Sequence, residues 1–143
     1  MTILAPAAPP VSRVRRVVAP GATIGGLALA TLALHLRDPH SSGSWGFCPS
    51  AALGFSCPGC GGLRAVNDLT NGQVGAALSS NLLVTLLLPV AAFALGLWFV
   101  DRWHSRQRAP SMTVVMPVAY AFLAVGLVFT VLRNLPAGAW LAP

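Results

Sequence analysis

The chain has 143 residues, which is enough for one domain, and it carries a net charge of +6. Its residues are 55% hydrophobic and only 8% charged, against about 25% charged in a typical soluble domain. This small number of charged residues cannot cover the surface of a water-soluble globule of this size. The composition therefore excludes an ordinary soluble protein and favours a membrane protein.

The chain begins with residues 1–16, which we predict to be a disordered, basic N-terminal tail; residues 17–143 form a single membrane domain. Residues 1–12 are rich in Pro and Ala and have no periodicity. Arg13, Arg15 and Arg16 then precede an apolar run over 17–36. About 20 residues span about 30 Å as a helix, which matches the hydrocarbon core of a bilayer.

The same pattern of basic residues before an apolar run also occurs in signal peptides, with 28–30 (ALA) as the cleavage site. The apolar run continues past that site, so we interpret the segment as a membrane span. Gly21 and Gly25 form a GxxxG pattern, and Ala22, Gly26 and Ala30 repeat every four residues. Small residues at this spacing favour close packing with another membrane protein or a second copy of the chain.

A cysteine-bearing loop is predicted over residues 37–81. It contains one short helix near 63–69 and a second from Val74, separated at Gly72, and both are expected to lie in the membrane surface. Two further apolar runs, 82–100 and 112–132, complete an all-α integral membrane protein with three transmembrane helices.

The basic residues predict the orientation. All nine are arginines, and they stand at the ends of apolar runs rather than in one stripe, which argues against nucleic acid as a partner. Six lie on the side of the N-terminus and three on the side of the loop, so we expect a cytoplasmic N-terminus with the loop and the C-terminus external. The inverted topology stays open.

The loop contains all three cysteines of the chain, Cys48, Cys57 and Cys60. Pro58-Gly59 predicts a type II turn, with Gly59 at positive φ, which brings Cys57 and Cys60 to its two ends. Cys60 is then close to the N-terminus of the next helix, where the helix dipole lowers the pKa of a thiol.

Three uses of these thiols compete. The first is structural: a disulfide, or a metal such as zinc held by Cys48, Cys57 and Cys60 with His40 as a fourth ligand, that clamps the loop. The second is redox cycling of Cys57 and Cys60. The third is a binding edge for a lipid headgroup or a partner, contacted by Arg64, a residue that is also in reach of Asp68 across one helical turn.

Other enzyme classes lack support in the sequence. The predicted spans contain no Asp, Glu, Lys or Arg, so no proton relay or ion path is indicated within one copy. The chain has no Ser/His/Asp set, no carboxylate pair and no phosphate-binding loop with a Lys. We therefore expect a non-enzymatic subunit or accessory factor with a cysteine-clamped loop. The alternative is a thiol–disulfide or metal-handling protein that uses Cys57 and Cys60.

The stretch over 48–82 resembles a family of small bacterial membrane proteins known only as a domain of unknown function. The matching positions are Cys48-Pro49, Gly54, 57–61 (CPGCG), Arg64-Ala65, Gly72, Ala76-Ala77 and Asn81, and the ending at 133–136 (RNLP) is also similar. Leu82 replaces an expected Pro, and the step from Cys48 to Cys57 is shorter by one residue. The resemblance implies a bacterial plasma-membrane protein and supplies no activity.

Overall fold

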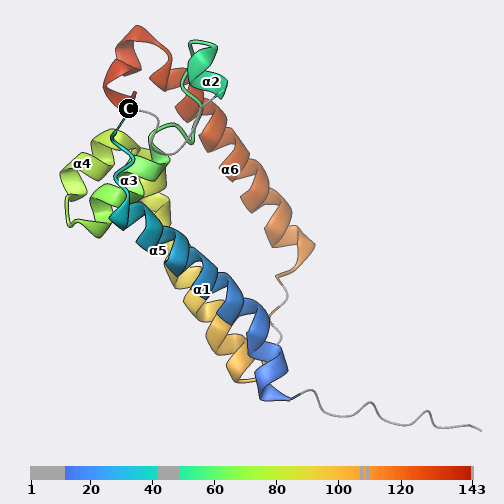
Figure 1. Cartoon of the computed structure of the whole chain (residues 1–143). Helices are drawn as coiled ribbons and strands as arrows, with labels where there is room; N and C mark the ends of the chain where they lie inside the picture. Colours follow the sequence, from blue (N-terminus) through green and yellow to red (C-terminus); the bar gives the residue numbers. More distant parts are fainter. Residues whose placement is uncertain (1–11, 42–48, 107, 109, 143) are drawn as a thin grey trace, which may run out of the picture.

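The computed structural model describes residues 12–41, 49–106, 108 and 110–142. Every regular element in these residues is a helix, as the sequence predicts (Figure 1). In chain order the elements are α1 (Arg13–Leu36), α2 (Pro49–Ala52), α3 (Gly62–Thr70), α4 (Val74–Ser80), α5 (Leu82–Trp103), α6 (Met112–Arg133) and the 3₁₀ helix η1 (Pro136–Leu141).

Three of these helices, α1, α5 and α6, are long and apolar enough to cross a membrane, and they confirm the three predicted spans. Their ends differ slightly from the prediction. α1 begins at Arg13, because the Ser12 hydroxyl caps it by accepting a hydrogen bond from the Arg15 amide at 3.4 Å. The basic cluster therefore belongs to the helix. α5 extends past Val100 to Trp103.

The short helices α3 and α4 confirm the elements predicted within the loop, whereas α2 and η1 were not predicted. α3 and α4 pack together at one end of the α1–α5 pair, and α2 lies beside the C-terminal end of α6 (Figure 1). Chain reversal between α3 and α4 occurs at Gly72, whose φ of 74° suits a residue without a Cβ.

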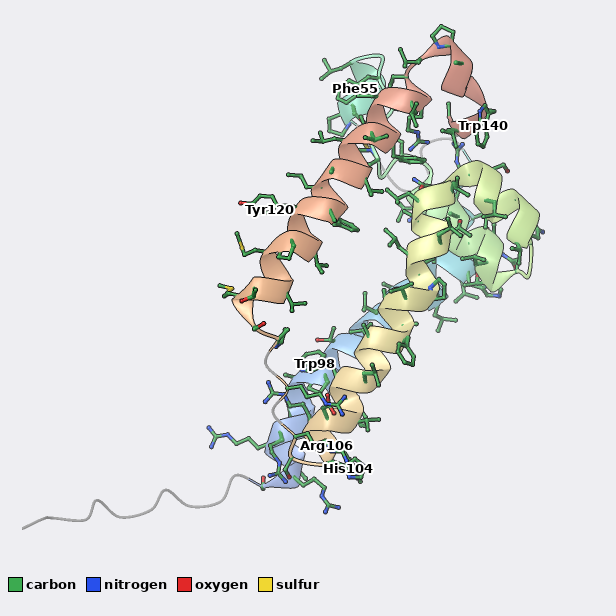
Figure 2. All side chains as sticks on the ribbon, turned by 180° about the vertical axis from the view of Figure 1, so that it is seen from behind. Phe55, Trp98, His104, Arg106, Tyr120 and Trp140 are labelled. Atoms are coloured by element: carbon green, nitrogen blue, oxygen red, sulfur yellow. The ribbon has the colours of Figure 1, made fainter. Side chains whose placement is uncertain are left out.

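The long helices are unevenly packed. α1 and α5 run side by side and antiparallel. The C-terminal end of α6 lies near the short helices, and the N-terminal end of α6 lies apart from the α1–α5 pair (Figure 1). Only Phe129 and Arg133 are buried in α6. Tyr120 is 64% exposed and points away from the other helices (Figure 2).

The buried residues concentrate where the short helices meet the ends of the long ones. Many of them are polar, which is unusual for a core and requires that each be hydrogen-bonded. The buried polar side chains among the described residues are Asn67, Asp68, Ser80, Asn81, Thr85 and Arg133. We call this end of the molecule the cap, and the cysteine turn lies within it.

Candidate functional site

The turn that carries Cys57 and Cys60 forms as predicted, but its type differs. The Cys60 amide donates to the Cys57 carbonyl at 3.1 Å, which closes a four-residue turn. The left-handed backbone lies at Gly61, with φ of 77°, and not at Gly59, so the type II prediction is wrong. A second turn follows directly, with the Gly62 amide bonded to the Gly59 carbonyl at 2.9 Å, and it leads the chain into α3. This double turn places the left-handed residue at the start of the helix.

The two sulfurs are close neighbours. Cys57 Sγ lies 3.1 Å from Cys60 Sγ, and both residues are half-buried and stand as thiols. A disulfide bond needs a sulfur–sulfur separation of about 2.05 Å, so a small movement of the two side chains would bring the sulfurs to bonding distance.

The surroundings of Cys57 favour its thiolate. A hydrogen bond from the side chain of Ser50 lowers the pKa of Cys57, and a second one from Cys60 lowers it further. Burial acts in the opposite direction and is outweighed. The same Ser50 hydroxyl lies 3.3 Å from Cys60 Sγ, so α2 provides a polar group for both thiols.

Asn81 holds the turn from the side of α5. Its side chain is completely buried, and its amide nitrogen donates to the Pro58 carbonyl at 2.9 Å and to the Cys60 carbonyl at 2.8 Å. Its amide oxygen accepts from the Val84 amide at 2.9 Å, which caps the N-terminus of α5. One side chain therefore fixes the turn relative to a membrane span.

Arg133 holds the turn from the side of α6. Its Nη1 donates to the Cys57 carbonyl at 2.9 Å and to the Cys60 carbonyl at 3.2 Å, and its guanidinium lies over the Phe129 ring at 5.0 Å. The residue is only 2% exposed, yet its Nε and Nη2 are buried without a hydrogen-bond partner among the described residues. A buried positive charge with spare donors next to two thiols attracts negative charge at the sulfurs.

Asn134 adds a third clamp one residue before the turn. Its amide oxygen accepts from the Ser56 amide at 2.8 Å, and its amide nitrogen donates to the Ser56 carbonyl at 2.8 Å. The pairing copies the double hydrogen bond of a β-ladder, so it fixes both the position and the direction of the chain that enters the turn.

His40 and Asp68 form a separate polar cluster in the cap. His40 Nε2 lies 2.8 Å from Asp68 Oδ1, and the Ser80 hydroxyl donates to Asp68 Oδ2 at 2.7 Å. The predicted pairing of Asp68 with Arg64 is wrong, because both carboxylate oxygens of Asp68 face His40 and Ser80 instead. Asp68 is nearly completely buried and therefore ties α3 to α4 and to the chain after α1.

The metal prediction remains untested. Cys48 lies outside the described residues. Among the residues that are described, no three His, Cys, Asp or Glu side chains come close enough to hold a metal ion, and the ring of His40 faces Asp68. Arg64, the predicted contact residue, is half-buried in the first turn of α3.

The sequence points to the thiols but not to the side chains that hold them. Asn81, Arg133 and Asn134 stand out in the sequence only as positions that resemble the family. The signal that points to them is their position, because a polar residue that directly borders a long apolar run is well placed to reach the backbone of a neighbouring loop.

Comparison with known proteins gives one match. Residues 48–95 match the family described as "Protein of unknown function (DUF2752)", which confirms the resemblance to a family of unknown function over the cysteine turn, the short helices and the first part of α5. No curated protein and no solved structure matches the chain. The chain is therefore a multi-pass membrane protein with a region similar to the DUF2752 family at residues 48–95.

Proposed function

We propose that Cys57 and Cys60 are a redox-active pair and that the protein is a membrane thiol–disulfide protein. The observation that carries the proposal is the 3.1 Å separation of the two sulfurs in a turn whose carbonyls are held by Asn81 and Arg133. Neighbouring thiols in a fixed frame are suited to reversible disulfide formation, because the backbone need not reorganise.

The frame also argues against a purely structural role for the sulfurs. A clamp is needed where a loop has no other restraint. Here the turn is bonded by Asn81 to α5, by Arg133 to α6 and, one residue earlier, by Asn134 to the end of α6. These hydrogen bonds do not involve sulfur, so they hold the turn in place without a bond between the two cysteines. This reverses our preference for an accessory factor with a cysteine-clamped loop.

The charge around the pair favours redox chemistry over metal handling. Arg133 places a positive charge next to the two thiols, and hydrogen bonds lower the pKa of Cys57. The hydrogen bonds stabilise a thiolate, the nucleophile of thiol–disulfide exchange. A buried positive charge works against a bound metal cation at the same sulfurs.

The proposed reaction is an exchange with a disulfide of a second protein. The Cys57 thiolate attacks one sulfur of that disulfide, forms a mixed disulfide and releases a partner thiolate, which takes up a proton. The Cys60 thiol then loses its proton and attacks Cys57 Sγ, which closes the Cys57–Cys60 disulfide and releases the second partner thiol. Two electrons pass from the pair to the partner, whose two sulfurs take up the proton released by Cys60 and one proton from solvent, and the reverse sequence regenerates the reduced pair.

We propose that the protein lies in the plasma membrane of a bacterium, with the N-terminus in the cytoplasm and the cap outside. The arginine count between the two sides supports this orientation, and disulfides persist outside the cytoplasm. An impermeant maleimide applied to intact, reduced cells will label Cys57 if this is correct. Labelling only after lysis would mean that the cap lies in the cytoplasm and that the proposed orientation is wrong.

The test of the function uses the full chain in mild detergent, with Cys48→Ala as the background so that the pair is the only titrating dithiol. Equilibration in buffers of graded dithiothreitol ratio, followed by alkylation and mass spectrometry, should show one reversible two-electron transition. Cys60→Ser should trap a mixed disulfide on Cys57, whereas Cys57→Ser should trap much less, because Cys57 has the lowered pKa.

Two results would overturn the proposal. If the pair stays a disulfide at all ratios and either serine variant lowers protein abundance, the cysteines are a clamp and the accessory-factor function holds. If native mass spectrometry shows a bound metal that a chelator removes, the pair handles metal instead.

A further inference from the structure

Basic residues gather at the end of the α1–α5 pair that is opposite to the cap. Because the two helices are antiparallel, the first turn of α1 lies beside the last turn of α5 (Figure 1). His104 and Arg106 lie at this same end (Figure 2). The four arginines that the two helices contribute here are Arg13, Arg15, Arg16 and Arg102.

Arg13 is held by an aromatic stack. Its guanidinium lies 5.2 Å from the centre of the Trp103 ring, and Trp103 stacks on Phe99 with ring centres 6.2 Å apart. The stack occupies the flat face of the guanidinium and leaves the N–H groups along its edge. Those groups match the oxygens of a phosphate, and the stack reduces the conformational entropy lost when they bind one.

A shallow hollow adjoins this stack. It has a volume of about 240 Å³ and is lined by Phe99, Val100, Trp103 and His104. Its walls are largely apolar, and they belong to the last turns of a membrane span. An apolar hollow at the end of a span, directly beside fixed cationic groups, matches a molecule that has both a hydrocarbon chain and an anionic head.

The positive charge at this end is not neutralised within the described residues. Asp101 is the one acidic side chain of the last turn of α5, and it lies 3.7 Å from Arg108. Arg16 Nε is buried and has no hydrogen-bond partner in the part of the chain that the structure describes. The cluster therefore retains donors and charge for a ligand.

We propose that this end of the α1–α5 pair is a binding site for an anionic phospholipid. The phosphate binds the edge of the Arg13 guanidinium with support from Arg16, and the first part of an acyl chain lies in the hollow beside Trp103. A free phosphate would not use the hollow, and a zwitterionic lipid would leave most of the positive charge unmatched. The site is independent of the dithiol function.

The test reconstitutes the full chain in vesicles of phosphatidylcholine with a minor share of phosphatidylglycerol, extracts it in mild detergent and counts retained lipids by native mass spectrometry. We expect phosphatidylglycerol to be enriched over its share in the vesicle. Arg13→Gln should lower that enrichment about fivefold, the factor that corresponds to loss of one basic contact near a membrane surface. Trp103→Ala should also lower it, because it removes the ring that holds the Arg13 guanidinium.

Arg15→Gln is the matched control, because it removes the same charge from the same helical turn without touching the stack. A loss in this variant that is clearly smaller than the loss in Arg13→Gln supports a defined site, because only Arg13 is held by the Trp103 ring. Equal losses in Arg13→Gln and Arg15→Gln would reduce the site to a general basic surface and overturn the proposal. Absence of enrichment in the unmodified protein, or displacement of the lipid by inorganic phosphate, would also overturn it. Circular dichroism of each variant verifies that the helices are intact.

Discussion

At the scale of single residues, the cap depends on side chains that bond to backbone carbonyls. Asn81 donates to two carbonyls of the cysteine turn and caps α5 with its oxygen. Arg133 donates to two carbonyls of the same turn from another helix. Because these groups are partly or wholly removed from water, loss of a donor takes a hydrogen bond away from carbonyls that water replaces poorly, which costs more than the same loss at an exposed position.

Asn81→Asp separates the two functions of this residue. A carboxylate keeps the oxygen that caps α5 but replaces the donor with an acceptor that faces the Pro58 and Cys60 carbonyls. We expect the free energy of unfolding to fall by about 3 kcal/mol, measured by thermal denaturation in detergent. Gln73→Glu, the same chemical change at an exposed position, should alter it by less than about 0.5 kcal/mol. Similar effects in both variants would contradict the assignment of Asn81.

Ser50→Ala tests the cause of the lowered pKa of Cys57. A hydrogen bond donated to a thiolate stabilises the charged form, so its removal raises the pKa and reduces the thiolate fraction at any pH below that pKa. The midpoint of the pH profile for alkylation of Cys57 by iodoacetamide, followed by peptide mass spectrometry, should therefore move upward. Ser79→Ala, at an exposed serine of α4, should leave the midpoint unchanged. An unshifted midpoint in Ser50→Ala would contradict the claim that Ser50 lowers the pKa of Cys57.

At the scale of elements, α6 joins the molecule mainly through its C-terminal end. Arg133 and Asn134 bond to the chain around Cys57, and η1 folds back against the last turns of α6. The rest of the helix is exposed to whatever surrounds it (Figure 2). The position of α6 is therefore set at the cap, where the dithiol lies.

Gly138→Ala should disrupt the return of η1. A Cβ at this position would overlap the Leu132 carbonyl oxygen, which is backbone and cannot rotate away. We expect a loss of more than about 2 kcal/mol in unfolding free energy. Gly96→Ala in α5 is the control, because no atom lies within 4 Å of its Cβ position and the substitution favours helix. A Gly138→Ala protein as stable as the control would mean that η1 does not pack on α6 in this way.

At the scale of the whole molecule, the protein has a polar core in the cap and three spans whose surfaces face outward. Most residues of each span are unburied within one copy. Residues without a partner in the chain contact lipid or another helix. The small-residue face of α1 is open, since among the described residues no atom outside the backbone of α1 lies within 4 Å of the Cβ positions of Gly21, Gly25 and Gly26.

The open face of α1 leads to a prediction about assembly. If helices associate through it, Gly26→Leu should lower cross-linking between copies in the membrane several-fold, because a bulky side chain prevents close approach. Gly96→Leu, at an equally open glycine of α5, should have little effect. A chain that purifies as a strict monomer, or equal losses in both variants, would contradict the prediction.

The sequence by itself determined the class of this protein. An apolar run of about 20 residues has few options other than a membrane helix, so three such runs fixed the spans to within a few residues. Turn chemistry at 57–61 (CPGCG) was also local enough to bring the two thiols together, although the left-handed residue is Gly61 and not Gly59.

Only the tertiary structure decided what holds that turn. Asn81 and Arg133 are far from the cysteines along the chain, and their hydrogen bonds exist because α5 begins and α6 ends beside the same loop. Asp68 shows the same limit, since helical spacing offered Arg64 as its partner while the fold brought His40 and Ser80. Local periodicity specifies which segments are helices, but contacts between distant segments follow from how those helices pack, and these contacts shape the site.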